Sequence, residues 1–162
     1  MSLIMSALSD RRRRLLQTVG FVVTMNVLGA LPAVFVSTDT SWLEEPWFYP
    51  PGIAFPVAWT ALFTLMGLSL SIVYNQGTDR PDVRLALATF AVQFALNLAW
   101  TPVFFGLRRP GLGLAVIVAL LIAILGTIAT VARVDRRAAA LLVPYLGWVS
   151  FATILNYAVY IQ

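Results

Sequence analysis

The stretch GLGLAVIVALLIAILGTIATVA, residues 111–132, contains no charged side chain. A helix needs about 20 consecutive apolar residues to cross the hydrocarbon core of a bilayer, and this stretch is long enough. Lipid tolerates only structures that pair their own backbone polar groups, which a continuous helix does. Residues 111–132 therefore predict a transmembrane helix, and with it a membrane protein.

Four further apolar runs of similar length occupy most of the remaining sequence. Each ends at charged or turn-forming residues, and their ranges are 15–36, 53–75, 83–107 and 138–161. A transmembrane β-barrel would instead show segments of roughly 10 residues with alternating hydrophobicity, whereas these runs are continuous. We therefore predict an all-α integral membrane protein, a five-transmembrane-helix bundle that forms a single domain over residues 1–162, with a connecting loop at 37–52.

The composition agrees with this class and excludes several chemistries. Of the 162 residues, 60% are apolar and only 11% are charged, against roughly 25% charged residues in soluble domains. The chain has neither Cys nor His, which removes thiolate and imidazole nucleophiles and the usual ligands of zinc and haem iron. No acidic or basic residue lies deep within a run, so the charged groups of proton relays and voltage sensors are missing. We expect no metal site and no required cofactor.

The 11 basic residues are all arginines and cluster beside the apolar runs. Cytoplasmic loops of membrane proteins carry an excess of Lys and Arg, so we interpret the clusters as orientation signals and expect no nucleic-acid partner. With the N-terminus inside, only Arg108 and Arg109 of the 11 lie outside. The sequence thus predicts a multi-pass protein of the cell membrane, with its N-terminus inside and its C-terminus and 37–52 loop outside. The first apolar run is too long for a signal peptide, and we expect it to be retained.

The few polar side chains inside the runs indicate a functional site, because polar groups in hydrocarbon are costly. Residues three or four apart lie on one face of a helix. Amides and aromatic rings share such faces: Gln93, Asn97, Trp100 and Phe104 in the third run, Tyr145, Trp148, Ala152 and Asn156 in the fifth, and Trp59 and Phe63 in the second. Asn26 lies in the first run.

Two interpretations of these faces stay open. Each amide taken singly is explained by interhelical hydrogen bonding, and the rings by core packing. A helical rise of about 1.5 Å per residue, however, puts Trp59 and Trp100 roughly 10 Å and Trp148 roughly 20 Å below the outer ends of their helices, deeper than an interfacial aromatic belt. Wide ring faces with a few uncharged polar groups indicate a pocket for a large, flat, apolar ligand.

Three ordered stretches resemble the translocator protein family, also called the tryptophan-rich sensory protein (TspO/MBR) or peripheral-type benzodiazepine receptor family. They are WFYPPGIAFPVAWT at 47–60, ALNLAWTPVFFG at 95–106 and LLVPYLGWVSFATILNY at 141–157. The resemblance implies a five-helix bundle, often a homodimer, in a lipid membrane. It also implies a cavity beneath the first connecting loop that binds porphyrins and, in some members, cholesterol and benzodiazepine-type drugs.

By motif position, the resemblance implies that Trp47 helps to close the loop. It also implies that the ligand is contacted by Trp59, Asn97, Trp100, Trp148, Ala152 and Leu155. Combined with the amide and aromatic faces, these positions form the predicted ligand-binding set. Its members are Asn26, Trp47, Trp59, Phe63, Asn97, Trp100, Phe104, Trp148, Ala152, Leu155 and Asn156.

We therefore expect a membrane binding protein for porphyrins, such as protoporphyrin, and similar flat hydrophobic ligands, acting as a sensor, regulator or transporter. Two alternatives remain. Some bacterial relatives break down protoporphyrin in light, and the resemblance places Trp59 and Trp148 at two of their pocket tryptophans, so the chain could be a light-dependent porphyrin-degrading enzyme. It could instead be a structural or partner-binding membrane protein. Phe48 and Ile53 stand where many relatives have Trp, which leaves the ligand preference open.

Overall fold

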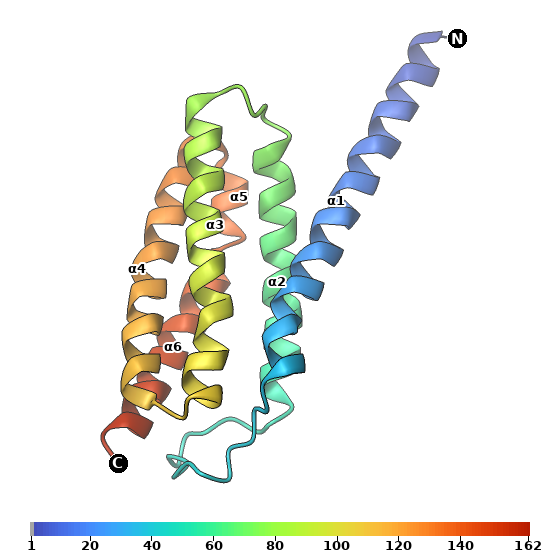
Figure 1. The fold of residues 1–162 in the computed structure, drawn as a ribbon. Helices are drawn as coiled ribbons and strands as arrows, with labels where there is room; N and C mark the ends of the chain where they lie inside the picture. The colour runs from blue at the N-terminus through green and yellow to red at the C-terminus, as the bar shows by residue number, and fades with distance from the viewer. Residues whose placement is uncertain (1) are drawn as a thin grey trace.

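The computed structural model describes residues 2–162, and their side chains from residue 7 onward. The described residues are mostly helical, without strands, and include five helical segments long and apolar enough to cross a membrane (Figure 1). The helices are α1 (Ser2–Phe35), α2 (Ala54–Tyr74), α3 (Pro81–Thr101), the π-helix η1 (Pro102–Gly106), α4 (Pro110–Val134), α5 (Arg136–Ala140) and α6 (Val143–Tyr160). The predicted all-α architecture with five membrane-spanning segments is confirmed.

The first helix is longer than the sequence indicates. The apolar run begins at residue 15, but α1 starts at Ser2 and continues through the arginines at 11–14. Arginine is a good helix former, and these four side chains are exposed, so the charges do not end the helix. The four arginines lie where the apolar part of α1 ends and its charged N-terminal part begins.

Two of the predicted spans change helical geometry at a proline. Pro102 begins the π-helix η1, in which the Leu107 N–H donates to the Pro102 carbonyl over 2.9 Å. In the fifth span, α5 ends at Ala140 and α6 begins at Val143, with Pro144 in its first turn. Proline lacks a backbone N–H and its ring clashes with the carbonyl four residues earlier, which explains both irregularities. Hydropathy does not reveal them because the side chains stay apolar throughout.

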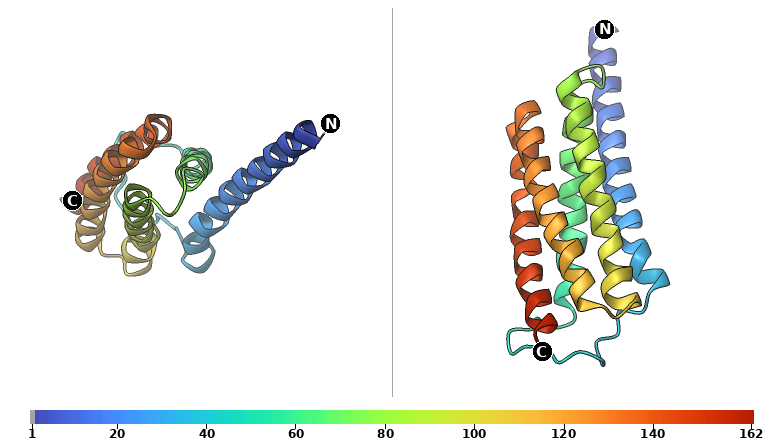
Figure 2. Two further views of the ribbon diagram at one scale, coloured as in Figure 1. Left: turned by 90° about the horizontal axis from the view of Figure 1, so that it is seen from above. Right: turned by 60° about the vertical axis from the view of Figure 1, so that its left-hand side comes forward.

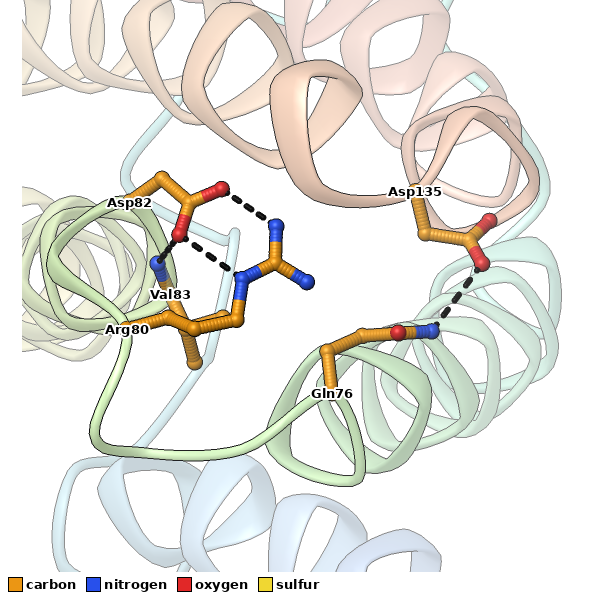
Figure 3. Close-up of polar contacts among 5 residues, drawn as sticks. All are labelled: Gln76, Arg80, Asp82, Val83 and Asp135. Atoms are coloured by element: carbon orange, nitrogen blue, oxygen red, sulfur yellow. Dashed lines mark hydrogen bonds and ion pairs between the residues drawn. The ribbon is translucent and has the colours of Figure 1, made fainter.

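Exposed polar contacts join the turns at the end of the bundle opposite the 36–53 loop (Figure 3). Arg80 pairs with Asp82 over 2.6 Å between Nη2 and Oδ2, and Asp82 Oδ1 accepts a hydrogen bond from the Val83 N–H over 3.0 Å. Across the gap, Gln76 Nε2 donates to Asp135 Oδ2 over 3.4 Å. Exposed ion pairs contribute about 0–1 kcal/mol, so these contacts arrange the turns more than they stabilise the bundle.

Helices α2 to α6 form the body of the bundle, while α1 lies along one side and its N-terminal half leans away (Figures 1 and 2). Helix α1 packs chiefly against α2. The two backbones approach closely at Gly67, where an added Cβ would stand 2.6 Å from Val22 Cα. Thr18 Oγ1 lies 2.7 Å from Ser71 Oγ nearby. Small residues and interhelical hydrogen bonds are what hold helices together in lipid.

The packed core lies between α2, α3, α4 and α6. Its buried apolar side chains include Met66, Phe90, Leu120, Ile124 and Val149. The long 36–53 loop and the C-terminus lie together at one end of the bundle, and the N-terminus lies at the other (Figure 1). The loop covers the helix ends at which the aromatic and amide faces of the sequence converge.

Candidate ligand-binding cavity

A cavity of about 1010 Å³ lies between the 36–53 loop and the helices α1, α2, α3, η1, α4 and α6. Pockets for small molecules commonly measure about 300–1,000 Å³, so this one is large. Nine residues of the predicted ligand-binding set line it: Asn26, Trp59, Phe63, Asn97, Trp100, Phe104, Ala152, Leu155 and Asn156. These residues come from four different helices and the π-helix, and the fold brings them together.

Trp47 and Trp148 of the predicted set do not line the cavity. Trp47 is 95% exposed, and its ring meets only Phe48, edge-on at 5.6 Å, among the described aromatic residues. Trp148 packs against Phe55 at 6.0 Å and Phe151 at 5.8 Å between ring centroids. Because Phe55 lines the cavity, Trp148 contacts a lining residue without lining the cavity itself. Contact of either tryptophan with a ligand stays a prediction.

Two stacked pairs of rings, from different helices, form part of the lining. Trp59 and Phe63 of α2 stack at 5.3 Å with 25° between their planes. Trp100 of α3 and Phe104 of η1 stack at 4.8 Å and 20°. Such pairs contribute about 0.5–1.5 kcal/mol beyond the burial of their area. Both pairs contribute large, flat apolar rings to the lining, a composition that suits a flat ring ligand.

Two of the cavity amides join helices to one another. Trp100 Nε1 donates to Asn156 Oδ1 over 3.0 Å, and Asn156 Nδ2 donates to the Pro110 carbonyl over 2.9 Å. Asn156 therefore connects α3, α6 and the first residue of α4. Asn26 Nδ2 donates to Thr64 Oγ1 over 3.2 Å and so connects α1 to α2. Interhelical hydrogen bonding, the simpler of the two interpretations, thus describes both amides, although both also line the cavity.

The third cavity amide belongs to a buried hydrogen-bond chain. Asn97 Nδ2 donates to Tyr145 Oη over 3.0 Å, and Tyr145 Oη donates to Gln93 Oε1 over 2.8 Å. Gln93 and Tyr145 are buried and lie behind the lining, which includes Asn97 alone of the three. The ring of Tyr145 also meets Trp59 edge-on at 6.4 Å. This chain links the polar part of the cavity wall to the core between α3 and α6.

Trp42 attaches the 36–53 loop to η1 and to the turn that follows it. Its ring lies 5.8 Å from Phe104, the Arg108 guanidinium lies 6.0 Å above it, and its Nε1 donates to the Asp39 carbonyl over 2.8 Å. Arg108 has a φ of 51°, in the left-handed region that is unfavourable for residues other than Gly. This strained residue follows η1 and places its side chain over the loop.

A second set of rings attaches the loop to α2 and α6. Phe48 meets Phe151 at 6.5 Å, and Tyr49 meets Phe55 at 5.5 Å. Burial raises the pKa of Tyr49, and the nearby Glu45 carboxylate raises it further. Tyr49 and Glu45 both line the cavity, so the loop contributes a phenol and a nearby carboxylate to the lining.

The sequence model of the TspO/MBR family matches residues 19–161, which include the loop and at least the greater part of every membrane-spanning segment. The chain belongs to the TspO/MBR family. It is 41% identical to the tryptophan-rich protein TspO of Chlorobaculum tepidum, over 82% of this chain and 86% of that protein. It is 40% identical to a tryptophan-rich sensory protein of Cereibacter sphaeroides, over 71% and 70% of the two chains. The human translocator protein is 36% identical, over 73% and 70%.

Several residues that line the cavity of this TspO/MBR bundle are absent from the predicted set. On α1, Gly29 and Ala33 line it together with Asn26, and their spacing of three and four residues is a helical signal that the sequence contains. An added Cβ at Gly29 would stand 2.4 Å from the Phe63 ring, so this glycine makes room for the stacked wall. Glu45 has no such signal, because its place in a loop without periodicity depends on tertiary contacts.

Proposed function

We propose that this chain binds porphyrins and similar flat, hydrophobic ring ligands in the cavity beneath the 36–53 loop, as a sensor, regulator or transporter. The observation that carries the proposal is the cavity of about 1010 Å³ lined by the stacked pairs Trp59–Phe63 and Trp100–Phe104. Membership in the TspO/MBR family supports it, as do the names sensory protein and translocator protein of two relatives.

The residue types available to hold a ring ligand also restrict the class of ligand. The chain has neither His nor Cys, so an imidazole or thiolate ligand to a bound metal is absent. Stacking against tryptophan and phenylalanine rings and hydrogen bonds from uncharged groups would hold the ligand instead. This chemistry favours a metal-free porphyrin such as protoporphyrin.

A titration of the purified protein with protoporphyrin tests the proposal. Binding is followed by the quenching of tryptophan fluorescence and independently by the absorbance of the porphyrin, because variants that lack a tryptophan also lose fluorescence. We expect saturable binding, weakened about tenfold by Trp59→Ala, since this change removes one stacked ring and breaks no hydrogen bond of the described residues. Trp148→Ala should weaken binding too, through the loss of support for Phe55.

Trp47→Ala is the matched control for the tryptophan substitutions. The ring of Trp47 is 95% exposed and does not line the cavity, so its removal should change porphyrin affinity less than Trp59→Ala does. Binding that does not saturate, or that is equally strong in wild type and Trp59→Ala, would contradict the proposed site.

We also propose that the protein lies in the cell membrane with its N-terminus inside and the 36–53 loop outside. The support is the distribution of arginines: the cluster at 11–14 belongs to the N-terminal end, whereas only Arg108 and Arg109 belong to the loop end. Reporter fusions test this orientation. Alkaline phosphatase, which is active outside the cytoplasm, should be active when fused after Gln162 and inactive when fused before α1.

By the same family resemblance we propose that the chain forms a homodimer. Exposed apolar side chains run along α1, among them Val19, Val23 and Val27, and this face is open to lipid or to a second copy. Light scattering coupled to size-exclusion chromatography in a mild detergent measures the protein mass directly. A mass of one chain at all protein concentrations would contradict the dimer.

A further inference from the structure

The hydrogen-bond chain behind the cavity wall has a fourth member that gives it a direction. Gln93 Nε2 lies 3.9 Å from Met66 Sδ, a weak acceptor, while Gln93 Oε1 accepts from Tyr145. Gln93 and Met66 are both 0% exposed. The chain therefore runs Asn97 Nδ2 to Tyr145 Oη, Tyr145 Oη to Gln93 Oε1, and Gln93 Nε2 to Met66 Sδ.

The reverse direction is chemically possible but leaves a buried atom without a partner. If both amides turned over, Gln93 would donate to Tyr145, and Tyr145 would donate to Asn97 Oδ1. Gln93 Oε1 would then face Met66 Sδ, which offers no hydrogen to donate. A buried acceptor without a partner is costly, so the position of Met66 favours the observed direction.

This direction leaves one atom of Asn97 available. Its Nδ2 is used by Tyr145, and among the described residues no donor reaches its Oδ1. No described buried side-chain nitrogen or oxygen lacks a partner, so this oxygen is accessible, and Asn97 lines the cavity. Asn156 differs, because it uses both of its polar atoms. Asn26 also has an Oδ1 that no described donor reaches, but its Nδ2 donates to the Val22 carbonyl and to Thr64 Oγ1, outside the chain of Tyr145 and Gln93.

We propose that Asn97 Oδ1 is a hydrogen-bond acceptor in the cavity wall, held in that orientation by Tyr145 and Gln93 as positioning residues. The cavity then selects, among flat apolar ligands, those that carry an N–H or O–H donor at the edge of the ring. Selectivity is set by Gln93, a residue that does not line the cavity. The inference rests on the proposed function in requiring that ring ligands enter this cavity.

A pair of probes with the same shape tests the selectivity. Carbazole has a single N–H at the edge of three fused rings, and dibenzofuran has an oxygen in its place. Their affinities are measured by competition with protoporphyrin, and the quantity compared is the ratio of the carbazole affinity to the dibenzofuran affinity. Because both probes partition into the same detergent in every sample, a change of this ratio between variants reports on the protein.

Tyr145→Phe provides the reference, because it removes the hydroxyl that orients Asn97 and leaves the ring in place. Without that hydroxyl the Asn97 amide is free to present either atom to the ligand. We expect the wild-type ratio to lie three- to tenfold above that of Tyr145→Phe, the range expected for one net hydrogen bond.

Gln93→Leu is the decisive variant. It removes the acceptor of Tyr145, whose hydroxyl then donates to Asn97 Oδ1 and leaves Asn97 Nδ2 to face the cavity. The ratio should therefore fall below that of Tyr145→Phe, which reverses the preference of the wild type. A merely structural loss would weaken both probes alike and would leave the ratio unchanged.

Thr127→Val is the matched control. Thr127 is also buried, and its hydroxyl donates to the Thr89 and Ala123 carbonyls, outside the chain of Asn97. Its ratio should equal that of the wild type.

Equal ratios in wild type, Tyr145→Phe and Gln93→Leu would overturn the inference. So would a failure of both probes to displace protoporphyrin. If protoporphyrin still binds in either of these cases, the proposed function stands and only the inference about Asn97 fails. If protoporphyrin does not bind at all, the proposed function is contradicted too.

Discussion

The indole N–H of Trp100 donates to Asn156 Oδ1 over 3.0 Å and so joins α3 to α6 at the wall of the cavity. The same asparagine donates to the Pro110 carbonyl at the start of α4. Trp100 in turn stacks on Phe104. One side of the cavity is thus built from side chains that also hold three helices together, and its shape is as rigid as the helix packing itself.

Replacing Asn156 by Leu should destabilise the bundle. The change removes two interhelical hydrogen bonds and leaves the Trp100 N–H and the Pro110 carbonyl without those partners. Hydrogen bonds between membrane helices contribute about 0.6 kcal/mol on average and up to about 1.7, so we expect a loss of about 1–2 kcal/mol, seen as a lower melting temperature in detergent. Thr153→Val on the same helix loses only a bond to the Val149 carbonyl and should cost less.

Two glycine substitutions should have opposite effects on stability. Gly67→Ala places a Cβ 2.6 Å from Val22 Cα, and because the obstacle is backbone, α1 must move away from α2. Overpacking of this kind costs about 1–3 kcal/mol. Gly126→Ala meets nothing within 4 Å and should stabilise α4 by up to about 1 kcal/mol through helix propensity. Equal melting temperatures of the two variants would contradict the close α1–α2 contact.

Replacing Trp42 by Ala should open the 36–53 loop. The substitution removes the ring contact with Phe104 and the cation–π contact with Arg108, interactions of about 0.5–1.5 and 0.5–1 kcal/mol respectively. We expect backbone amides of the loop to exchange hydrogen faster and bound porphyrin to dissociate about tenfold faster. Trp47→Ala removes an equally large but exposed ring of the same loop, and its effect on the dissociation rate should be smaller.

The closed loop should be insensitive to pH over a wide range. Hydrogen bonds from Ser41 lower the pKa of Asp39 from its usual 3.8, and burial raises the pKa of Tyr49 above 10.0. The stabilising ionised form of Asp39 is therefore lost only as the pH falls through its lowered pKa, and the neutral form of Tyr49 only as the pH rises through its raised pKa. Porphyrin affinity should be constant between about pH 5 and 9 apart from titration of the ligand itself, which a parallel titration of the free porphyrin measures. A change of loop amide exchange within this window would contradict the prediction.

The helical faces of the site were readable from the sequence because a helix repeats every 3.6 residues. That periodicity placed Asn97, Trp100 and Phe104 together, and all three line the cavity. It could not distinguish lining residues from those behind them. Trp148 shares its predicted face with Ala152, yet Trp148 does not line the cavity and contacts its lining through Phe55. The rotation of α6 about its own axis depends on its packing against other helices, chiefly α4.

The class of the protein and its five membrane-spanning segments follow from the sequence alone, because the length of each apolar run must match the thickness of the bilayer whatever its neighbours are. The proline breaks, the fit of Gly29 against Phe63 and the closure of the loop by Trp42 depend on the tertiary structure. So does the direction of the Asn97–Tyr145–Gln93 chain, which a methionine on α2 favours through contacts between residues far apart in the sequence. Periodicity describes a single helix, whereas the polarity of the cavity arises only where three helices meet.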